Sequence, residues 1–197
     1  MRGQEEGVRL LCISGITIPI LPRPKKQIWP NIEAGFISEY PEIDEVVIER
    51  IDRRCRPWDF DWMKEFCDDL VARYDDGKPT IIVGHSAGGI FACNIAERFE
   101  NTCVLGVVTI CSPHELLDGL FLRKLEVRSD INIPIISVGG MVDGIVPVWT
   151  TRHPLSRKHK SFWATHRRTF ARRPYISRDI ARIAKKEFAR PHNQAHA

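Results

Sequence analysis

Residues 80–89 read Thr-Ile-Ile-Val-Gly-His-Ser-Ala-Gly-Gly, and they are the clearest indication of the architecture of this chain. The first four residues have the apolar, β-branched composition of a buried strand, and residues 87–99 repeat large apolar side chains every fourth position, as a helix does. A Gly-x-Ser-x-Gly turn joins the two, with Ser86 at its tip. Gly84 and Gly88 remove side chains that would collide in so sharp a turn. The stretch therefore predicts a nucleophile elbow, a strand-to-helix turn that presents a serine for covalent chemistry.

The rest of the chain alternates short apolar runs with amphipathic stretches, which is typical of βαβ units. Six runs rich in Val, Ile and Leu are predicted strands: residues 8–14, 45–51, 80–84, 105–111, 133–138 and 161–165. Helices are expected over residues 58–74, 87–99 and 174–190, a loop over 15–30, and a loop, short helix or lid over 112–132. Continuous apolar strands are covered on both faces. We therefore expect α/β architecture: a three-layer αβα sandwich around a mostly parallel six-stranded sheet, in one domain (residues 1–190) without a large cap, followed by a flexible tail (191–197).

Length and composition exclude several classes of protein. The 197 residues suffice for one buried core, and no run of 18 apolar residues occurs that could span a membrane. The first residues lack the pattern of a signal peptide. None of the six cysteines forms a Cys-x-x-Cys pair, so we expect free, mostly buried thiols in a cytoplasmic protein: Cys12, Cys55, Cys67, Cys93, Cys103 and Cys111.

Charge is unevenly distributed along the chain. The net charge is +4, but residues 151–190 carry 13 Lys or Arg against two acids, Asp179 and Glu187. Such a region can attract an anionic membrane surface or an acidic substrate, or be a solvated face without a partner. No nucleic-acid-binding motif accompanies it, so nucleic acid is not an expected partner.

A serine nucleophile needs a histidine base, and the base needs an acid that fixes its tautomer. In nucleophile-elbow enzymes the chain order is serine, acid, histidine. The acid candidate is Asp143, in the segment Gly-Gly-Met-Val-Asp-Gly-Ile-Val-Pro that follows the expected strand 133–138. An aspartate before a glycine is also a common turn residue, and Glu115 is a weaker rival.

The base candidate is His166, at the end of the expected last strand 161–165. Its rivals are His153 and His159, in a basic stretch expected to be a loop. We expect His85 to point away from the substrate, and two further histidines lie in the expected tail, His192 and His196.

Developing negative charge on the substrate requires an oxyanion hole made of backbone N–H groups. One donor should be the amide of Ala87, the residue after the nucleophile. The other should come from the loop after the first strand, where Ile16 is favoured and Thr17 is the alternative.

These residues resemble the α/β-hydrolase superfamily, and within it small lipase- and esterase-type members. The resemblance extends over residues 8–188: the elbow and its helix (81–97), a strand ending in Ser-Pro-His (107–114), an Asp-x-x-Val-Pro segment (143–147) and the passage from a histidine into the last helix (166–188). It implies hydrolysis of a small-molecule or lipid carboxylic ester through an acyl-enzyme on Ser86, with His166 and Asp143, and without cofactor or metal. Two departures are Ser14-Gly15, where members often have His-Gly, and Arg167-Arg168 after the base.

Acyl transfer or cofactor-free peroxidation on the same triad, and a non-catalytic scaffold for an anionic ligand or partner, are the alternative functions.

Overall fold

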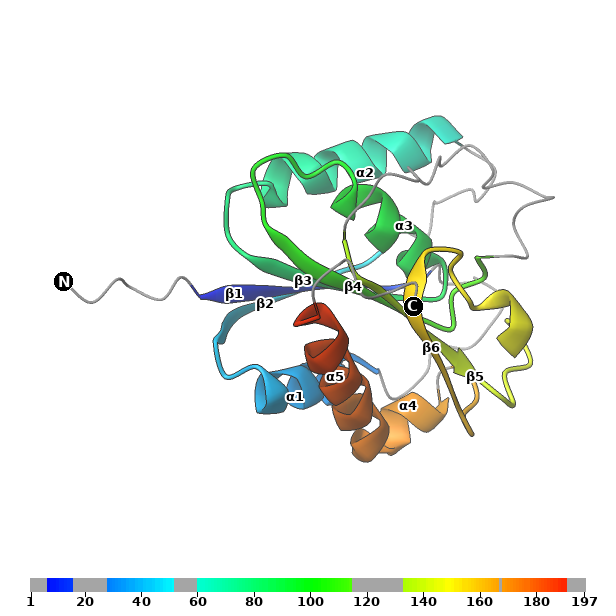
Figure 1. The fold of residues 1–197 in the computed structure, drawn as a ribbon. Helices are drawn as coiled ribbons and strands as arrows, with labels where there is room; N and C mark the ends of the chain where they lie inside the picture. Colours follow the sequence, from blue (N-terminus) through cyan, green and yellow to red (C-terminus); the bar gives the residue numbers. More distant parts are fainter. Residues whose placement is uncertain (1–6, 16–27, 52–59, 115–132, 167, 191–197) are drawn as a thin grey trace.

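The computed structural model describes residues 7–15, 28–51, 60–114, 133–166 and 168–190. In this part of the chain six strands form one sheet in which every pair of neighbours is parallel (Figure 1). The order across the sheet is β2-β1-β3-β4-β5-β6. The strands are β1 (Val8–Ile13), β2 (Ile43–Glu49), β3 (Thr80–His85), β4 (Val104–Ile110), β5 (Ile135–Gly140) and β6 (Ser156–Phe162).

Helices cover both faces of the sheet (Figure 1). One face carries α1 (Trp29–Glu39), α4 (Arg168–Arg172) and α5 (Pro174–Phe188), and the other carries α2 (Phe60–Tyr74) and α3 (Ala87–Ala96). Successive strand residues point to opposite faces, so Leu10 and Leu11 belong to two separate cores. The expected three-layer αβα sandwich with a parallel six-stranded sheet is confirmed.

Two expectations about elements were wrong. Helix α1 begins at Trp29, inside the segment expected to be a loop, with Pro30 in its first turn, where a missing N–H costs no hydrogen bond. Strand β6 begins at Ser156 and ends at Phe162, earlier than the expected 161–165, so His159 lies in a strand and not in a loop. As an edge strand, β6 has little apolar character, and its cations discourage pairing with another chain.

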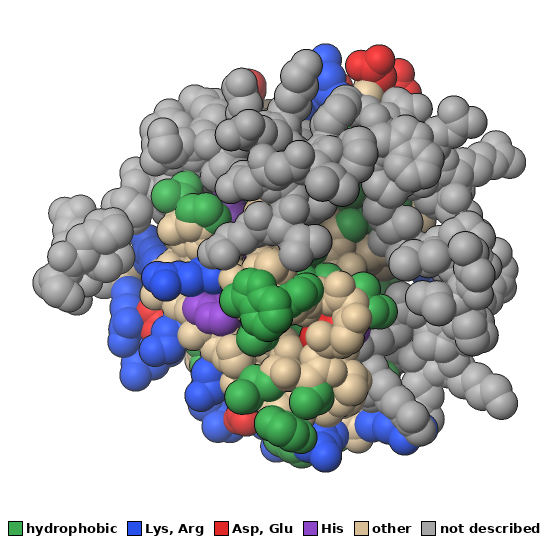
Figure 2. Space-filling model, turned by 90° about the vertical axis from the view of Figure 1, so that its right-hand side faces the viewer, with side chains coloured by type: hydrophobic (Ala, Val, Ile, Leu, Met, Phe, Trp, Pro, Cys, Tyr) green, Lys and Arg blue, Asp and Glu red, His purple; other side chains and the backbone are tan. Residues whose placement is uncertain are grey.

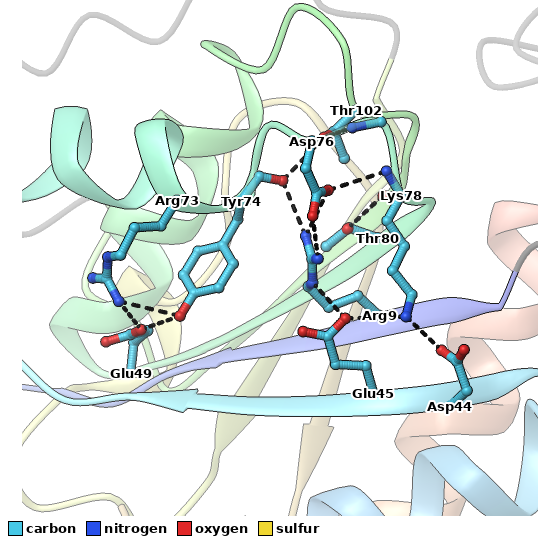
Figure 3. A network of polar contacts seen from close by, with 11 residues as sticks. Arg9, Asp44, Glu45, Glu49, Arg73, Tyr74, Asp76, Lys78, Thr80 and Thr102 are labelled. Atoms are coloured by element: carbon cyan, nitrogen blue, oxygen red, sulfur yellow. Dashed lines mark hydrogen bonds and ion pairs between the residues drawn. The ribbon is translucent and has the colours of Figure 1, made fainter.

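A polar network ties the amino ends of the strands together, at the edge of the sheet opposite the elbow (Figure 3). Arg9 of β1 is only 4% exposed, and its guanidinium bonds both carboxylate oxygens of Asp76 at 3.0 and 2.6 Å. Its Nε lies 3.1 Å from Glu45 of β2, and its Nη1 donates to the carbonyl of Tyr74. The hydrogen bonds from Arg9 lower the pKa of Asp76 to about 2. A buried guanidinium with all these partners holds β1, β2 and the loop after α2 together.

The order in which strands are added to the sheet reverses at β1: β2 lies on one side of it, and β3 lies on the other. Loops that follow neighbouring strands diverge at such a point, which is where open α/β sheets bind their ligands. Ser14 and Gly15, which follow β1, and the turn after β3 both lie there.

The described cysteines are free thiols; Cys103 is exposed and the others are buried: Cys12, Cys67, Cys93 and Cys111. No helix among the described residues combines the length and the apolar character that crossing a membrane requires.

Candidate active site

Ser86 occupies the turn between β3 and α3, with φ of 56° and ψ of −131°. This left-handed backbone is costly for a residue with a side chain and persists only where the surroundings enforce it. The Ser86 N–H donates to the carbonyl of Ile110 at 2.8 Å, and the Ser86 carbonyl accepts from the Gly89 N–H at 3.0 Å. A Cβ on Gly84 would lie 2.3 Å from the Gly88 oxygen, and a Cβ on Gly88 would lie 2.2 Å from the Ile13 oxygen. Both positions therefore require glycine.

Asp143 and His166, 23 positions apart, meet at the carboxyl ends of β5 and β6. The His166 Nδ1 lies 2.7 Å from Asp143 Oδ2. Backbone hydrogen bonds bring the two loops together: the Met141 N–H donates to Phe162 and the Val142 N–H donates to Ala164. The side chain of His166 is 9% exposed and that of Asp143 is fully buried.

The other carboxylate oxygen of Asp143 is fixed by its own loop. Its Oδ1 accepts hydrogen bonds from the N–H groups of Ile145 and Val146, at 2.8 and 2.9 Å. Burial alone would raise the pKa of Asp143, but the hydrogen bonds from His166, Val146 and Ile145 outweigh it and lower the pKa. Asp143 is therefore ionised at neutral pH and accepts the Nδ1 proton of His166, which leaves Nε2 of the ring as the acceptor.

Two contacts link this pair to the serine turn. His85, the residue before Ser86, has its Nε2 2.8 Å from the backbone oxygen of His166, and the two imidazole rings are 4.8 Å apart. From the other side, Gly15 lies so close that a Cβ there would be 2.6 Å from the Ser86 Cβ and 3.2 Å from its Oγ. The serine, the histidine and Gly15 therefore lie at one edge of the sheet.

The family follows from comparison with known sequences. A family model described as the alpha/beta hydrolase family matches residues 29–195, more than four-fifths of the chain. The chain belongs to the alpha/beta hydrolase family. A search of curated proteins gives no match.

Solved structures share the fold of this hydrolase at low sequence identity. The esterase domain of a Rhodothermus marinus protein is 16% identical with a TM-score of 0.55, covering 95% of this chain and 90% of that one. Est1E from Butyrivibrio proteoclasticus is 12% identical with a TM-score of 0.57, covering 95% and 91%. A monoacylglycerol lipase from Paleococcus ferrophilus is 12% identical with a TM-score of 0.57, covering 91% and 94%.

Cys111 also lies at this site, although the sequence did not indicate it. The Sγ of Cys111, a side-chain nitrogen of His166 and a carboxylate oxygen of Asp143 all lie within 4.8 Å of one another. Burial, and then the Asp143 charge, raise the pKa of this thiol well above its ordinary value, so it stays protonated beside the carboxylate. These three donor atoms are close enough to hold one cation, but the direct His166–Asp143 hydrogen bond accounts for the arrangement without one.

The rival histidines of the hydrolase have other partners. His153 is buried with its ring against that of His114, and its Nδ1 accepts from the Leu155 N–H. His159 is hydrogen-bonded through Nε2 to Thr151. The other residues raised by the sequence lie outside the described part of the chain: Ile16, Thr17, Glu115, His192 and His196.

Proposed function

We propose that this alpha/beta hydrolase cleaves carboxylic esters with a Ser86-His166-Asp143 triad. The observation that carries the proposal is the 2.7 Å hydrogen bond between His166 and Asp143, together with a serine in a strained turn whose preceding residue, His85, lies within hydrogen-bond distance of the His166 backbone oxygen. A core histidine needs no ionised partner, and a core serine needs no left-handed backbone. Their combination at one sheet edge is what acyl transfer requires.

The proposed reaction proceeds in two halves. Ser86 Oγ attacks the acyl carbon while His166 Nε2 takes the hydroxyl proton, and the resulting imidazolium is stabilised by Asp143. The imidazolium then gives its proton to the departing alcohol as the ester C–O bond breaks, which leaves an acyl-enzyme. Water attacks the acyl group in the second half: His166 takes a proton from the water and returns it to Ser86, and the carboxylic acid is released.

Backbone donors are proposed to stabilise the tetrahedral intermediates. Ala87 is the first residue of α3, so its N–H has no acceptor within its own helix and lies at the positive end of the helix dipole. Ile16 remains the proposed second donor, and the preceding Gly15 approaches the nucleophile closely. We propose that both N–H groups bond the substrate oxygen as it becomes negatively charged.

The ester class is supported by what the similar structures are called, since they include esterases and a monoacylglycerol lipase. We propose a small-molecule or lipid ester as the substrate. Acyl transfer, or peroxidation, would need the same three side chains and would differ in the molecule that takes up the acyl group.

The test is hydrolysis of p-nitrophenyl butyrate by Ser86→Ala, with Ser38→Ala on α1 as a control far from the site. We expect kcat to fall at least ~1000-fold for Ser86→Ala, because the nucleophile is lost, and to be unchanged for Ser38→Ala. Asp143→Asn should cost roughly 1000- to 10,000-fold, because it favours the wrong tautomer of His166. An unchanged rate in Ser86→Ala would refute the triad.

Labelling with a fluorophosphonate probe supplies an independent measurement. The probe should modify Ser86 in the wild type and leave Ser86→Ala unmodified. An enzyme that is labelled on Ser86 but turns over none of a series of acyl esters of increasing length would refute ester hydrolysis while leaving the reactive serine established.

A further inference from the structure

Exposed apolar side chains are concentrated in the loop of the proposed acid and in the segments that follow it, residues 141–163. Five of the nine large hydrophobic residues that are exposed in the described part of the chain form an apolar rim: Met141, Val142, Ile145, Trp149 and Trp163. Trp149 is 71% exposed and Trp163 is 67% exposed. Figure 2 shows hydrophobic side chains in the middle of the face at the β5–β6 end, with Lys and Arg side chains to their left and below.

The apolar rim is continuous with the active site. Met141, Val142 and Ile145 belong to the loop that carries Asp143. Trp163 directly follows β6, and the backbone hydrogen bonds from Met141 to Phe162 and from Val142 to Ala164 lie on either side of it. A group of large apolar side chains as exposed as these marks an interaction site on a protein surface.

The charge around the apolar rim identifies the kind of partner. Residues 144–178 contain nine Lys or Arg and no Asp or Glu. Arg152 follows Trp149 by three positions, Arg172 ends α4, and Arg173 lies between α4 and α5; all three are exposed. Tryptophan side chains favour the boundary between hydrocarbon and water, and anionic lipid headgroups attract Lys and Arg.

We propose that the apolar rim docks this protein on an anionic lipid surface, with the active site facing the lipid. The rim enters the headgroup region while the surrounding cations contact the anionic headgroups. A second copy of the chain fits this face less well, because a two-fold contact would place one acid-free basic stretch against another. Docking does not depend on hydrolysis; the delivery of a lipid ester to Ser86 does rest on the proposed function.

The experiment measures co-sedimentation of the Ser86→Ala protein with phosphatidylcholine vesicles, with and without about 30% phosphatidylserine. We expect binding to the anionic vesicles, and we expect it to weaken as salt rises from about 0.02 to 0.3 M because headgroup attraction is screened. Trp149→Ala/Trp163→Ala should weaken the binding roughly tenfold or more, because the two aromatic anchors are lost. The control Ile37→Ala/Ile48→Ala, which truncates exposed side chains on α1 and β2, should bind normally.

A second pair of variants isolates the charge. Arg152→Gln/Arg172→Gln should bind anionic vesicles several-fold more weakly than Lys64→Gln/Lys186→Gln, which has the same net charge but loses exposed cations on α2 and α5. Because all the substituted side chains are exposed, thermal melts should show that every variant is folded. Failure to bind either vesicle, or equal binding by all the variants, would overturn the proposal. The proposal would also be overturned if the tryptophan variant lost a dimer but still bound the vesicles normally. None of these outcomes depends on the activity of Ser86, so docking and the proposed function can fail separately.

Discussion

His85 holds the backbone of His166: its Nε2 lies 2.8 Å from the His166 carbonyl oxygen, 81 positions away along the chain. Because a carbonyl only accepts, the His85 Nε2 carries the proton. The bond is buried, and it joins the residue before the proposed nucleophile to the proposed base. We infer that His85 is a positioning residue that sets the distance between the Ser86 turn and the His166 loop.

Replacing His85 tests this inference. His85→Leu removes the donor, and we expect kcat to fall roughly 10- to 100-fold with little change in KM, because small displacements of catalytic groups slow the chemical step. His85→Gln keeps an N–H donor near the same place and should recover most of the loss. The rate of fluorophosphonate labelling should follow kcat in both variants. If His85→Leu only lowers the melting temperature, while both rates stay normal well below it, the role of His85 is structural.

Cys111 provides a test of which atom is the nucleophile. Its thiol is next to His166 and Asp143, but burial keeps it protonated, and a protonated thiol is a poor nucleophile. We expect N-ethylmaleimide at pH 7 to alkylate the exposed Cys103 and to leave ester hydrolysis intact, with mass spectrometry showing Cys111 unmodified until the protein unfolds. Inactivation in step with alkylation of Cys111 would instead assign the chemistry to the thiol.

Replacing Gly88 measures how much stability the close contact between β1 and α3 requires of this glycine. In a helix, alanine is more favourable than glycine by about 1 kcal/mol, so propensity alone predicts that Gly88→Ala stabilises the protein. The new Cβ would lie 2.2 Å from the Ile13 oxygen and 2.7 Å from the Ser14 oxygen, both backbone atoms that cannot easily move. We therefore expect a loss of about 2–4 kcal/mol in the free energy of unfolding, measured by urea titration.

The matched control is Gly144→Ala in the loop after β5. Apart from the glycine and its two chain neighbours, no atom of the described residues lies within 4 Å of the position of its new Cβ, so we expect a change within about 0.5 kcal/mol. Equal stability of the two variants would show that the β1–α3 contact is looser than the structure has it.

The sequence predicted the buried strands well because their signal is local. β1, β3 and β4 are continuous apolar runs, and the structure places them within two residues of the predicted bounds. β6 was displaced because an edge strand exposes much of its surface, so its sequence Ser-Arg-Lys-His-Lys-Ser-Phe lacks the apolar signal. Helix α1 was missed because the proline-rich residues before it favoured a loop.

The candidate site also contains residues that the sequence could identify and contacts that it could not. Ser86, Asp143 and His166 could be selected by chain order and by their place after strands, which are properties of the sequence alone. The contacts of His85 and Cys111 could not be predicted, since they depend on register. His85 pairs with Ile110, and this brings the next residue, Cys111, to the edge of the sheet where the β5 and β6 loops meet.

A buried pair of histidines predicts how stability depends on pH. His114 and His153 pack with their ring centroids 4.9 Å apart. The His114 Nε2 is hydrogen-bonded to the Thr109 hydroxyl, and the backbone N–H of His153 donates to the Ser137 hydroxyl. Burial, with the His153 charge as a smaller cause, lowers the pKa of His114 to about 3, and burial lowers that of His153 to about 4. Both rings are therefore neutral in the folded protein at neutral pH.

The unfolded chain takes up these two protons near pH 6.5, whereas the folded protein resists them until pH 4 or below. Stability from this pair is therefore complete above pH 6.5 and is lost as the pH falls from there toward 4, by up to about 2.7 kcal/mol per pH unit for two protons. Carboxylates with lowered pKa, such as Asp76 and Asp143, stabilise the folded protein above about pH 4, and most of this stability is lost only below that pH, so the two effects separate. Urea titrations from pH 7.5 to 4.5 should show this slope, and His153→Gln should reduce it by about one proton even if that variant is less stable overall. A wild-type stability that stays constant over this range would mean that the two rings take up protons in the folded state as readily as in the unfolded chain.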